Sequence, residues 1–472
     1  MINSRLIEIL RVFNKKEIRN LRKWIISPIG NQREDVVLLF EYLLKNERYK
    51  ENNGLTKTNI FNQVYIDLGY DDAKMRQLVF FGMKTLEEFI IYLELKKDEI
   101  RGKMALADFY RNRKLEKSYL KNYKYLNSLH DTQPYRNGDY LRKEYLILKE
   151  EYEYVVKYSR TKKINLLEVS ESLYHSFIAD QLRQGCLMHA YRSFYATDYK
   201  IGLIDEIINE VITNPQLLKI PAISIYFHGY KTNLEKENPE HFQNLKDAMN
   251  KFAHLFPMDE YGDIYHIAIN HCIGQMNRGK DEFIRESFEM YKQGFDKDLF
   301  LDNDIISRWT FLNVVLIALK LNEFEWVENF INKNQIYLEE KHKESLVNIS
   351  FAIFYYQKRD FSKAMNYLLQ YEHDDLTINL RAKNILLKIY YEEDEIGALE
   401  SLLGSMRTYL SRKKVMGYHK DNFKNIINLT KKLLKVKPYD KDQKIKLKTL
   451  IEEADPLTTD DRNWLLTQLE NV

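Results

Sequence analysis

Apolar residues recur along this chain at the spacing of amphipathic helices. Four of them fall on one helical stripe between residues 361 and 368: Phe361, Ala364, Met365 and Leu368. The segment before it carries the same spacing in Ile349, Ala352, Ile353 and Tyr356. Because Ala364 is small, two such helices can approach closely. The pattern therefore predicts a pair of antiparallel helices that bury their apolar stripes against each other.

This helix–turn–helix pattern occurs three times between Arg308 and Leu403. The turns are at Asn322-Glu323, Arg359-Asp360 and Glu393-Asp394, and an apolar residue opens the helix after each turn: Phe324, Phe361 and Ile396. The spacings are 361 − 324 = 37 and 396 − 361 = 35 residues. A two-helix repeat of that length is typical of an α-solenoid, because one pair cannot cover both of its apolar faces. We therefore expect an all-α fold built as an α-solenoid of antiparallel helix hairpins.

The segment from Tyr355 to Leu368 resembles a tetratricopeptide (TPR) repeat. Aromatic residues end its first helix, the turn Asp360-Phe361 follows, and Ala364 comes four residues after the aspartate. Ile389 to Leu399 is a looser copy, and the resemblance extends from Asp263 to Tyr409. The family's early Trp-Leu-Gly cluster and final proline are missing. The resemblance implies a protein-binding scaffold.

Residues 1–100 differ from the repeats. Asn14, Thr56 and Asp71 stand where helix caps are expected. The short helix after Thr56, the turn at 67–70 and the long helix from Asp72 resemble the helix-turn-helix core of winged-helix domains. Its groove contacts would be Lys74, Arg76 and Gln77, although Asp71 and Asp72 would repel phosphates. The alternative is a helical cap on the solenoid, since terminal repeats are usually atypical.

The rest of the chain divides at composition changes. We predict an N-terminal helical domain at 1–100, a repeat region at 101–410 and a C-terminal helical cap at 411–472, with the basic run Ser411 to Lys414 at the exit from the repeats. Met104 to Ser128 has the pattern of one long helix, and a hairpin is expected about Arg183-Gln184-Gly185. In the cap, we expect Thr459 to cap the last helix and Trp464 to dock onto the final repeat.

Composition narrows the class of protein. The chain has 472 residues, is 44% hydrophobic and has only 8 prolines and 16 glycines, which favours long helices. Its net charge of +3 gives no general nucleic-acid footprint. Two isolated cysteines fit a reducing compartment, and the longest apolar run, 311–319, is too short to span a bilayer. We therefore expect a cytoplasmic protein without membrane segments, and the abundance of Lys, Asn, Ile and Tyr hints at a bacterial source.

Candidate chemistry is sparse. Gly274 to Asp281 has the glycine and lysine spacing of a phosphate loop, but Asp281 replaces the required Ser or Thr. We interpret the segment as a repeat turn in which Gly279 ends one helix and Asp281 caps the next. Cys186 and His189 share a helix face, yet two ligands do not make a zinc site. We expect no cofactor, no metal and no enzymatic activity. The bases and tyrosines between Arg111 and Tyr125 have the composition of a single-strand RNA surface, or of a buried tyrosine stripe with a solvated basic face.

Two functional hypotheses follow. The first is a non-enzymatic scaffold that binds a protein or peptide partner through the first helices of its hairpins, with Asn313, Asn348 and Lys383 as candidate contacts. The second is a nucleic-acid-linked regulator that reads DNA through Lys74, Arg76 and Gln77 and senses a partner with its repeats. The near-neutral charge favours the first.

Overall fold

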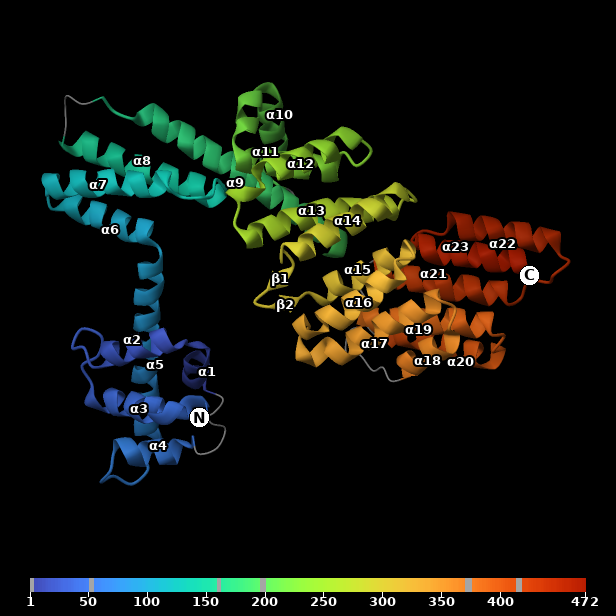
Figure 1. Ribbon diagram of the computed structural model, residues 1–472, viewed down its shortest axis with the longest axis horizontal. Coiled ribbons are helices and arrows are strands. Elements are labelled where there is room, and N and C mark those ends of the chain that lie inside the picture. Colours follow the sequence, from blue (N-terminus) through green and yellow to red (C-terminus); the bar gives the residue numbers. More distant parts are fainter. Residues whose placement is uncertain (1–3, 51–54, 159–162, 196–200, 370–375, 413–417) are drawn as a thin grey trace. The chain divides into compact units, whose positions relative to one another are not determined.

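The structure is a computed structural model that describes residues 4–50, 55–158, 163–195, 201–369, 376–412 and 418–472. Helices account for nearly all of the described secondary structure, apart from one short β-hairpin (Figure 1). The predicted all-α class is thereby confirmed. The chain forms two compact units: unit 1 contains Met1–Thr132 and Leu146–Asn165, and unit 2 contains Gln133–Tyr145 and Leu166–Val472. The predicted domain boundaries at residues 100 and 410 stay predictions.

Unit 1 begins with five helices around one apolar core. They are α1 (Arg5–Val12), α2 (Lys15–Ile25), α3 (Glu34–Leu44), α4 (Lys57–Val64) and α5 (Asp72–Lys97), with a 3₁₀ helix η1 (Lys45–Lys50) after α3. Helices α1, α2 and α3 pack on α5, and α4 packs on α3 (Figure 1). The predicted caps are confirmed: the side chains of Asn14, Thr56 and Asp71 accept hydrogen bonds from first-turn amides of α2, α4 and α5.

The second part of unit 1 is built from α6 (Glu99–Asn112), α7 (Glu116–Asp131) and the residues of α8 (Gly138–Tyr158) from Leu146 onward. The prediction of a single helix from Met104 to Ser128 is wrong. Lys114 has φ +59°, a left-handed conformation that ends α6 and reverses the chain into α7. Since no glycine or proline marks this turn, sequence patterns do not predict it.

Unit 2 is a series of neighbouring helix pairs. Its helices are α9 (Leu166–Tyr195), α10 (Ile204–Thr213), α11 (Pro221–Leu234), α12 (Pro239–Phe252), α13 (Met258–Met276), α14 (Glu282–Asp296), α15 (Arg308–Lys320), α16 (Phe324–Asn334), α17 (Glu340–Gln357), α18 (Phe361–Leu369), α19 (Leu376–Glu392), α20 (Ile396–Arg412), α21 (Tyr418–Leu433), α22 (Lys441–Glu453) and α23 (Thr459–Asn471). The 3₁₀ helices are η2 (Pro215–Lys219), η3 (Ala253–Leu255) and η4 (Gln335–Tyr337). The repeat prediction is confirmed in one detail, because α16, α18 and α20 begin at Phe324, Phe361 and Ile396.

Packing within unit 2 follows the order of the pairs. The helices of each pair contact each other, and we call them first and second helices: α11/α12, α13/α14, α15/α16, α17/α18 and α19/α20. Three of these first helices also contact the first helix of the next pair: α11 contacts α13, α15 contacts α17 and α17 contacts α19. A small β-hairpin, β1 (Leu301–Asp302) with β2 (Ile305–Ile306), separates α14 from α15, and the positive φ of Asn303 and Asp304 gives it a type I′ turn.

One turn geometry recurs at five helix hairpins, which are α6/α7 of unit 1 and the pairs α13/α14, α15/α16, α17/α18 and α19/α20 of unit 2. The residue that ends the helix is left-handed, with φ of +59° at Lys114, +82° at Gly279, +58° at Asn322, +59° at Arg359 and +59° at Asp394. In each case the next amide donates to the carbonyl five residues earlier, for example Asp360 N to Tyr355 O at 2.9 Å. This is the Schellman pattern, which satisfies the last carbonyls of a helix. The turns at Asn322, Arg359 and Asp394 share this geometry, and their left-handed residues follow one another at 359 − 322 = 37 and 394 − 359 = 35 residues.

Glycine at these turns should stabilise the protein. Only one of the five is glycine, and a left-handed β-carbon costs more than the flexibility that glycine brings. We expect Lys114→Gly and Asp394→Gly each to raise the free energy of unfolding by about 0.5–1 kcal/mol. Urea denaturation followed by circular dichroism measures this. Lys114→Ala is the matched control, since it removes the same side chain and keeps the unfavourable φ. An equal gain with alanine would contradict the explanation.

Helix α9 corrects a second expectation. The predicted hairpin about Gly185 does not form, because α9 continues without a break through that residue. A β-carbon at Gly185 would lie 2.9 Å from the ring of Tyr230 on α11. The glycine therefore serves close packing of two helices and not a turn.

The phosphate-loop-like segment is a repeat turn, as interpreted. Gly279 is the left-handed residue between α13 and α14, and the segment before it is helical. Asp281 stands just before α14 but makes no side-chain cap, because its own backbone is already helical. A phosphate loop needs a strand before the glycines. The expectation that Asp281 caps α14 is therefore wrong, while the rejection of the nucleotide motif is supported by the local geometry.

The C-terminal helices α21, α22 and α23 share an apolar core with α19 and α20. Thr458, one residue before the predicted Thr459, caps α23 by accepting from the amide of Asp461. Trp464 is 8% exposed, and its indole lies 5.4 Å from the ring of Tyr391 on α19. Trp464 therefore docks on the last of the repeat-like pairs, as the sequence predicts.

Candidate protein-binding surface

The common turn gives each first helix a comparable set of positions. Counting back 13, 6 and 2 residues from the left-handed residue gives Trp309, Leu316 and Lys320 on α15, and Arg381, Lys388 and Glu392 on α19. The spacing i, i+7, i+11 places each set on one stripe of its helix. We call these six residues the first-helix face. The three side chains on α15 are largely apolar, whereas the three on α19 are all charged.

On α19 the first-helix face is covered by α23. Lys388 Nζ lies 2.7 Å from Asp461 Oδ1, and Asn384 donates to the same oxygen at 2.8 Å. Trp464 Nε1 donates to Glu392 Oε1 at 2.9 Å. The side chains of Lys388 and Asp461 are 10% and 5% exposed. A buried carboxylate and a buried ammonium thus hold α23 in one register.

Glu392 joins three helices. Besides Trp464, it accepts from Tyr356 on α17 at 2.9 Å and from Arg359, after α17, at 3.2 Å. Burial, reinforced by Glu392, raises the pKa of Tyr356 far above its usual value. Burial would raise the pKa of Asp461, but Lys388, Asn384 and Thr458 together hold it below the usual range of aspartate. Asp461 is therefore ionised at neutral pH, and the network links α17, α19 and α23.

Arg381 is the least satisfied member of this face. Burial lowers the pKa of its guanidinium, against the attraction of Asp461 and Asp460. Its Nη1 is closed to solvent and has no hydrogen-bond partner among the described residues. The Oδ1 of Asn384 is in the same condition. Unpaired buried polar atoms cost free energy, so the contact between α19 and α23 is specific but incomplete.

On α15 the first-helix face is open at Trp309. Trp309 is 38% exposed, whereas Leu316 is half-buried and packs against the main apolar core. Lys320 Nζ lies 2.8 Å from Asp460 Oδ1 at the start of α23. An exposed tryptophan beside an aliphatic side chain is the composition of a binding hot spot. This is the part of the face that a partner can reach without rearrangement.

The three predicted contacts lie on first helices but outside this face. Asn313 is half-buried and hydrogen-bonds Tyr291 of α14. Asn348 is only 9% exposed, and Lys383 is half-buried with its Nζ 6.0 Å from the Tyr409 ring of α20. All three side chains are therefore largely taken up by the packing of the pairs. As contacts with a partner they stay predictions, and Trp309, which sequence reasoning passed over, is the more accessible residue.

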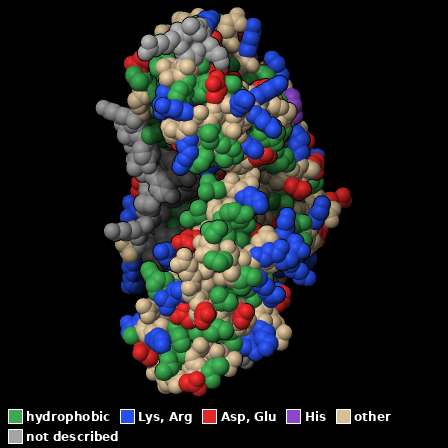
Figure 2. Space-filling view, turned by 90° about the vertical axis from the view of Figure 1, so that its left-hand side faces the viewer, with side chains coloured by type: hydrophobic (Ala, Val, Ile, Leu, Met, Phe, Trp, Pro, Cys, Tyr) green, Lys and Arg blue, Asp and Glu red, His purple; other side chains and the backbone are tan. Residues whose placement is uncertain are grey.

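The predicted DNA contacts are engaged within unit 1. Lys74 Nζ lies 4.3 Å from the ring of Tyr65, and Arg76 Nε lies 3.0 Å from Asp72. Gln77 is exposed. No β-strand occurs among the described residues of unit 1, so the described part offers no wing. In Figure 2, Lys and Arg side chains are interspersed with Asp and Glu over the face in view, without a single-sign patch.

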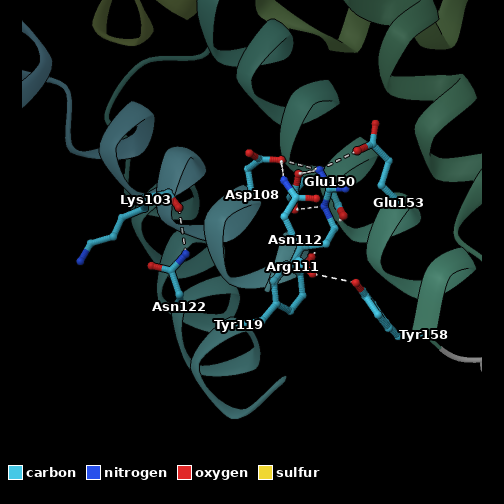
Figure 3. Close-up of polar contacts among 9 residues, drawn as sticks. All are labelled: Lys103, Asp108, Arg111, Asn112, Tyr119, Asn122, Glu150, Glu153 and Tyr158. Atoms are coloured by element: carbon cyan, nitrogen blue, oxygen red, sulfur yellow. Dashed lines mark hydrogen bonds and ion pairs between the residues drawn. The ribbon is translucent and has the colours of Figure 1, made fainter. Parts of the chain in front are cut away.

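The basic, tyrosine-rich segment of α6 and α7 is partly an internal network (Figure 3). Arg111 is bound by Glu150 at 2.8 Å, and Asp108 and Glu153 also lie within 2.8 Å. The Tyr119 ring stacks on Tyr154 at 3.9 Å. This matches the predicted buried stripe at Tyr119 and Leu126, whereas Leu115 is 44% exposed and lies outside it. Arg111 is consequently neutralised, whereas Arg113, Lys114, Lys117, Lys121 and Lys124 are exposed, so the RNA-surface alternative stays a prediction.

A pocket of about 350 Å³ lies between α10, η2, α11 and α12. One wall is apolar, with Val211, Leu218 and Phe227, and the other carries His228, Lys231 and His241. Glu235 pairs with Lys231 and accepts from His241 Nε2 at 2.7 Å. Burial lowers the pKa of His228 to about 4. Lys231, Glu235 and His241 bind one another, whereas Nδ1 of His228 and Nδ1 of His241 are buried without a hydrogen-bond partner among the described residues. We place the binding function elsewhere.

Acid should weaken unit 2 through His271. Burial lowers its folded pKa to about 4 from 6.5, helped by Lys236 and Arg278. Because the unfolded chain takes up the proton first, stability from this group is complete above pH 6.5 and is lost as pH falls toward 4. We expect the loss between pH 7 and 4.5 to be about 2 kcal/mol smaller in His271→Gln. Urea midpoints at both pH values test this, and equal losses in the two proteins would contradict it.

No protein-family model matches the chain, and no curated protein matches it either. Within the described ranges, no group of three or more His, Cys, Asp or Glu side chains is arranged to hold a metal ion. None of the helices in those ranges has the length and apolarity needed to cross a bilayer. The likeness to TPR repeats thus rests on the repeated helix pairs and their turns.

Proposed function

We propose that this chain is a non-enzymatic protein-binding scaffold whose helix pairs stack as a TPR-like solenoid. The observation that carries the proposal is the recurrence of one helix-pair geometry that leaves Trp309 and Leu316 of α15 accessible. Stacked pairs bury their apolar faces against neighbours and expose a continuous row of first helices, which suits the recognition of another protein. Contacts between successive first helices support such a row.

The chemistry of the open face favours a protein partner over a nucleic acid. Tryptophan and leucine bury apolar area on association, and aromatic residues are enriched at the centres of interfaces. Lys320, the one cation of this face on α15, is already paired with Asp460. A nucleic-acid ligand would need several free cations along one groove. The DNA-reading hypothesis for Lys74, Arg76 and Gln77 stays a prediction, and no contact in unit 1 favours it.

Native affinity purification from the source cells tests the proposal, with each sample divided into nuclease-treated and untreated halves. We expect a stoichiometric protein that survives nuclease and is lost at least tenfold in Trp309→Glu. Ile336→Glu is the matched control, because Ile336 is 67% exposed but lies on η4, after a second helix. A partner that both variants retain equally would contradict the proposed face. Loss of all partners on nuclease treatment would favour the nucleic-acid reading.

A further inference from the structure

We propose that the first-helix face of α19 is a receptor site for an acidic, tryptophan-bearing helix of a partner protein, and that α23 is its resident occupant. This inference rests on the proposed scaffold function and names the kind of partner that it takes. The partner helix replaces α23 on Arg381, Lys388 and Glu392. The protein's own C-terminal helix then regulates access to the site.

Charge complementarity identifies the occupant. The receptor side contributes the cations Lys320, Arg381 and Lys388. Helix α23 carries the opposite charges, Asp460 and Asp461, in its first turn. Acidic residues are favoured there by the helix dipole as well. One turn later Trp464 donates to Glu392. The site therefore recognises a helix that carries an aspartate and, three residues after it, a tryptophan.

The apolar side of α23 completes the recognition pattern. Leu465 and Leu469 are buried in the core shared with α21 and α22. A competing helix must supply leucines at the same spacing, four and eight residues after the aspartate. The partner pattern is therefore Asp, then Trp at +3, Leu at +4 and Leu at +8, which is one face of an amphipathic helix.

The resident helix is an imperfect ligand for this site. With α23 in place, Arg381 Nη1 and Asn384 Oδ1 stay buried without hydrogen-bond partners among the described residues. Buried ion pairs such as Lys388–Asp461 fix the register more than they add net stability, because both charges lose their hydration. A partner helix with one more carboxylate near Arg381 would satisfy the free guanidinium nitrogen. Replacement of α23 by such a partner helix is thereby favoured.

The contrast with the other faces of α19 strengthens the argument. Toward α17, α19 buries Ile378, Ala382, Ile385 and Ile389 in the main core, and toward α20 it buries Leu380 and Leu387. The buried side chains that α19 contributes on these two sides are apolar, and its polar contacts there are those of Glu392 with Tyr356 and of Lys383 with Tyr409. Among the described residues, the unpaired buried polar atoms of α19 lie in its contact with α23. Such a polar seam is the place where a helix can open locally while its neighbours remain folded.

A labelled peptide of residues 457–472 and the full-length protein provide the test. By fluorescence anisotropy, we expect weak binding to the wild type, because its own α23 competes at high effective concentration. Binding should be at least tenfold tighter to full-length Trp464→Ala, whose α23 is a poor occupant of an unchanged receptor. Addition of Lys388→Glu to that variant should abolish binding. Absence of peptide binding to folded Trp464→Ala would overturn the proposal.

Hydrogen exchange of the wild-type protein gives a second measurement that needs no variant. We expect α23 amides to exchange at least tenfold faster than those of α19 and α20, through an opening with little dependence on denaturant. Exchange of α23 only together with α19 would overturn the proposal, and a dimer formed by swapping α23 would replace the partner with a second copy. Neither outcome affects a partner that depends on Trp309, so the scaffold function is tested separately.

Discussion

Replacement of Arg111 by alanine is expected to destabilise unit 1 by about 3–5 kcal/mol. Arg111 donates to both oxygens of Glu150, and their side chains are only 12% and 7% exposed. Burial already raises the pKa of Glu150 in spite of this pair. Without the guanidinium, Glu150 must be buried as an unpaired charge or take up a proton, and Asp108 and Glu153 lose their cation. Hydrogen exchange of α6, α7 and α8 measures the loss within unit 1.

The matched control for this prediction lies in the same helix. Arg101 pairs with Asp98, but its side chain is 70% exposed. Because exposed pairs contribute little, Arg101→Ala should cost less than about 1 kcal/mol. The double variant Arg111→Leu with Glu150→Met should recover most of the loss, since it leaves no buried charge behind. If Arg111→Ala and Arg101→Ala have equal effects, the pair with Glu150 does not stabilise unit 1.

The regular part of this fold was visible in the sequence. Phe324, Phe361 and Ile396 begin helices because an apolar stripe resumes there after two polar residues. Asn14, with Glu17 three residues on, predicted a capping box that the structure contains. Both signals depend only on residues within one turn of each other. Local patterns of this kind can be read from one chain without knowledge of what packs against it.

Sequence patterns did not predict two other features of the fold, the turn at Lys114 and the position of Gly185 inside a helix. Lys114 adopts the left-handed conformation that glycine usually fills, so no sequence mark separated α6 from α7. Gly185 looked like a breaker, yet it lies inside α9 where Tyr230 approaches its backbone. At Gly185 a tertiary contact accompanies a conformation that the local preference of glycine does not favour, and at Lys114 the left-handed conformation runs against the local preference of lysine.

The candidate site was only partly predictable for a related reason. That Trp464 docks onto the last pair followed from its place on a terminal amphipathic helix. Its polar partners did not, because Lys388 and Asp461 are 461 − 388 = 73 residues apart and each looks like an ordinary surface charge. Position relative to the common turn would have grouped Trp309 with Arg381. That signal emerges only when the left-handed residues are known.

Loss of the Asp461 carboxylate should have the second large effect. We expect Asp461→Ala to destabilise the seam between α19 and α23 by about 3–5 kcal/mol, because Lys388 then remains buried without its counter-charge and Arg381 loses one of the two carboxylates that attract it. Acid should act in the same direction. Since the folded pKa of Asp461 lies below its usual value, its stabilisation is present above about pH 4 and is lost as pH falls through the folded pKa.

The neighbouring residue separates this explanation from a general effect on α23. Asp460 also pairs with a lysine, Lys320, but its side chain is 59% exposed. Asp460→Ala should therefore cost less than about 1 kcal/mol, although it removes the same group from the same helix turn. Urea denaturation together with hydrogen exchange of α19 and α23 compares the two variants. Equal losses would show that helix α23 needs acidic residues only for its dipole, whereas a loss confined to Asp461→Ala would locate the stabilising charge in the buried seam.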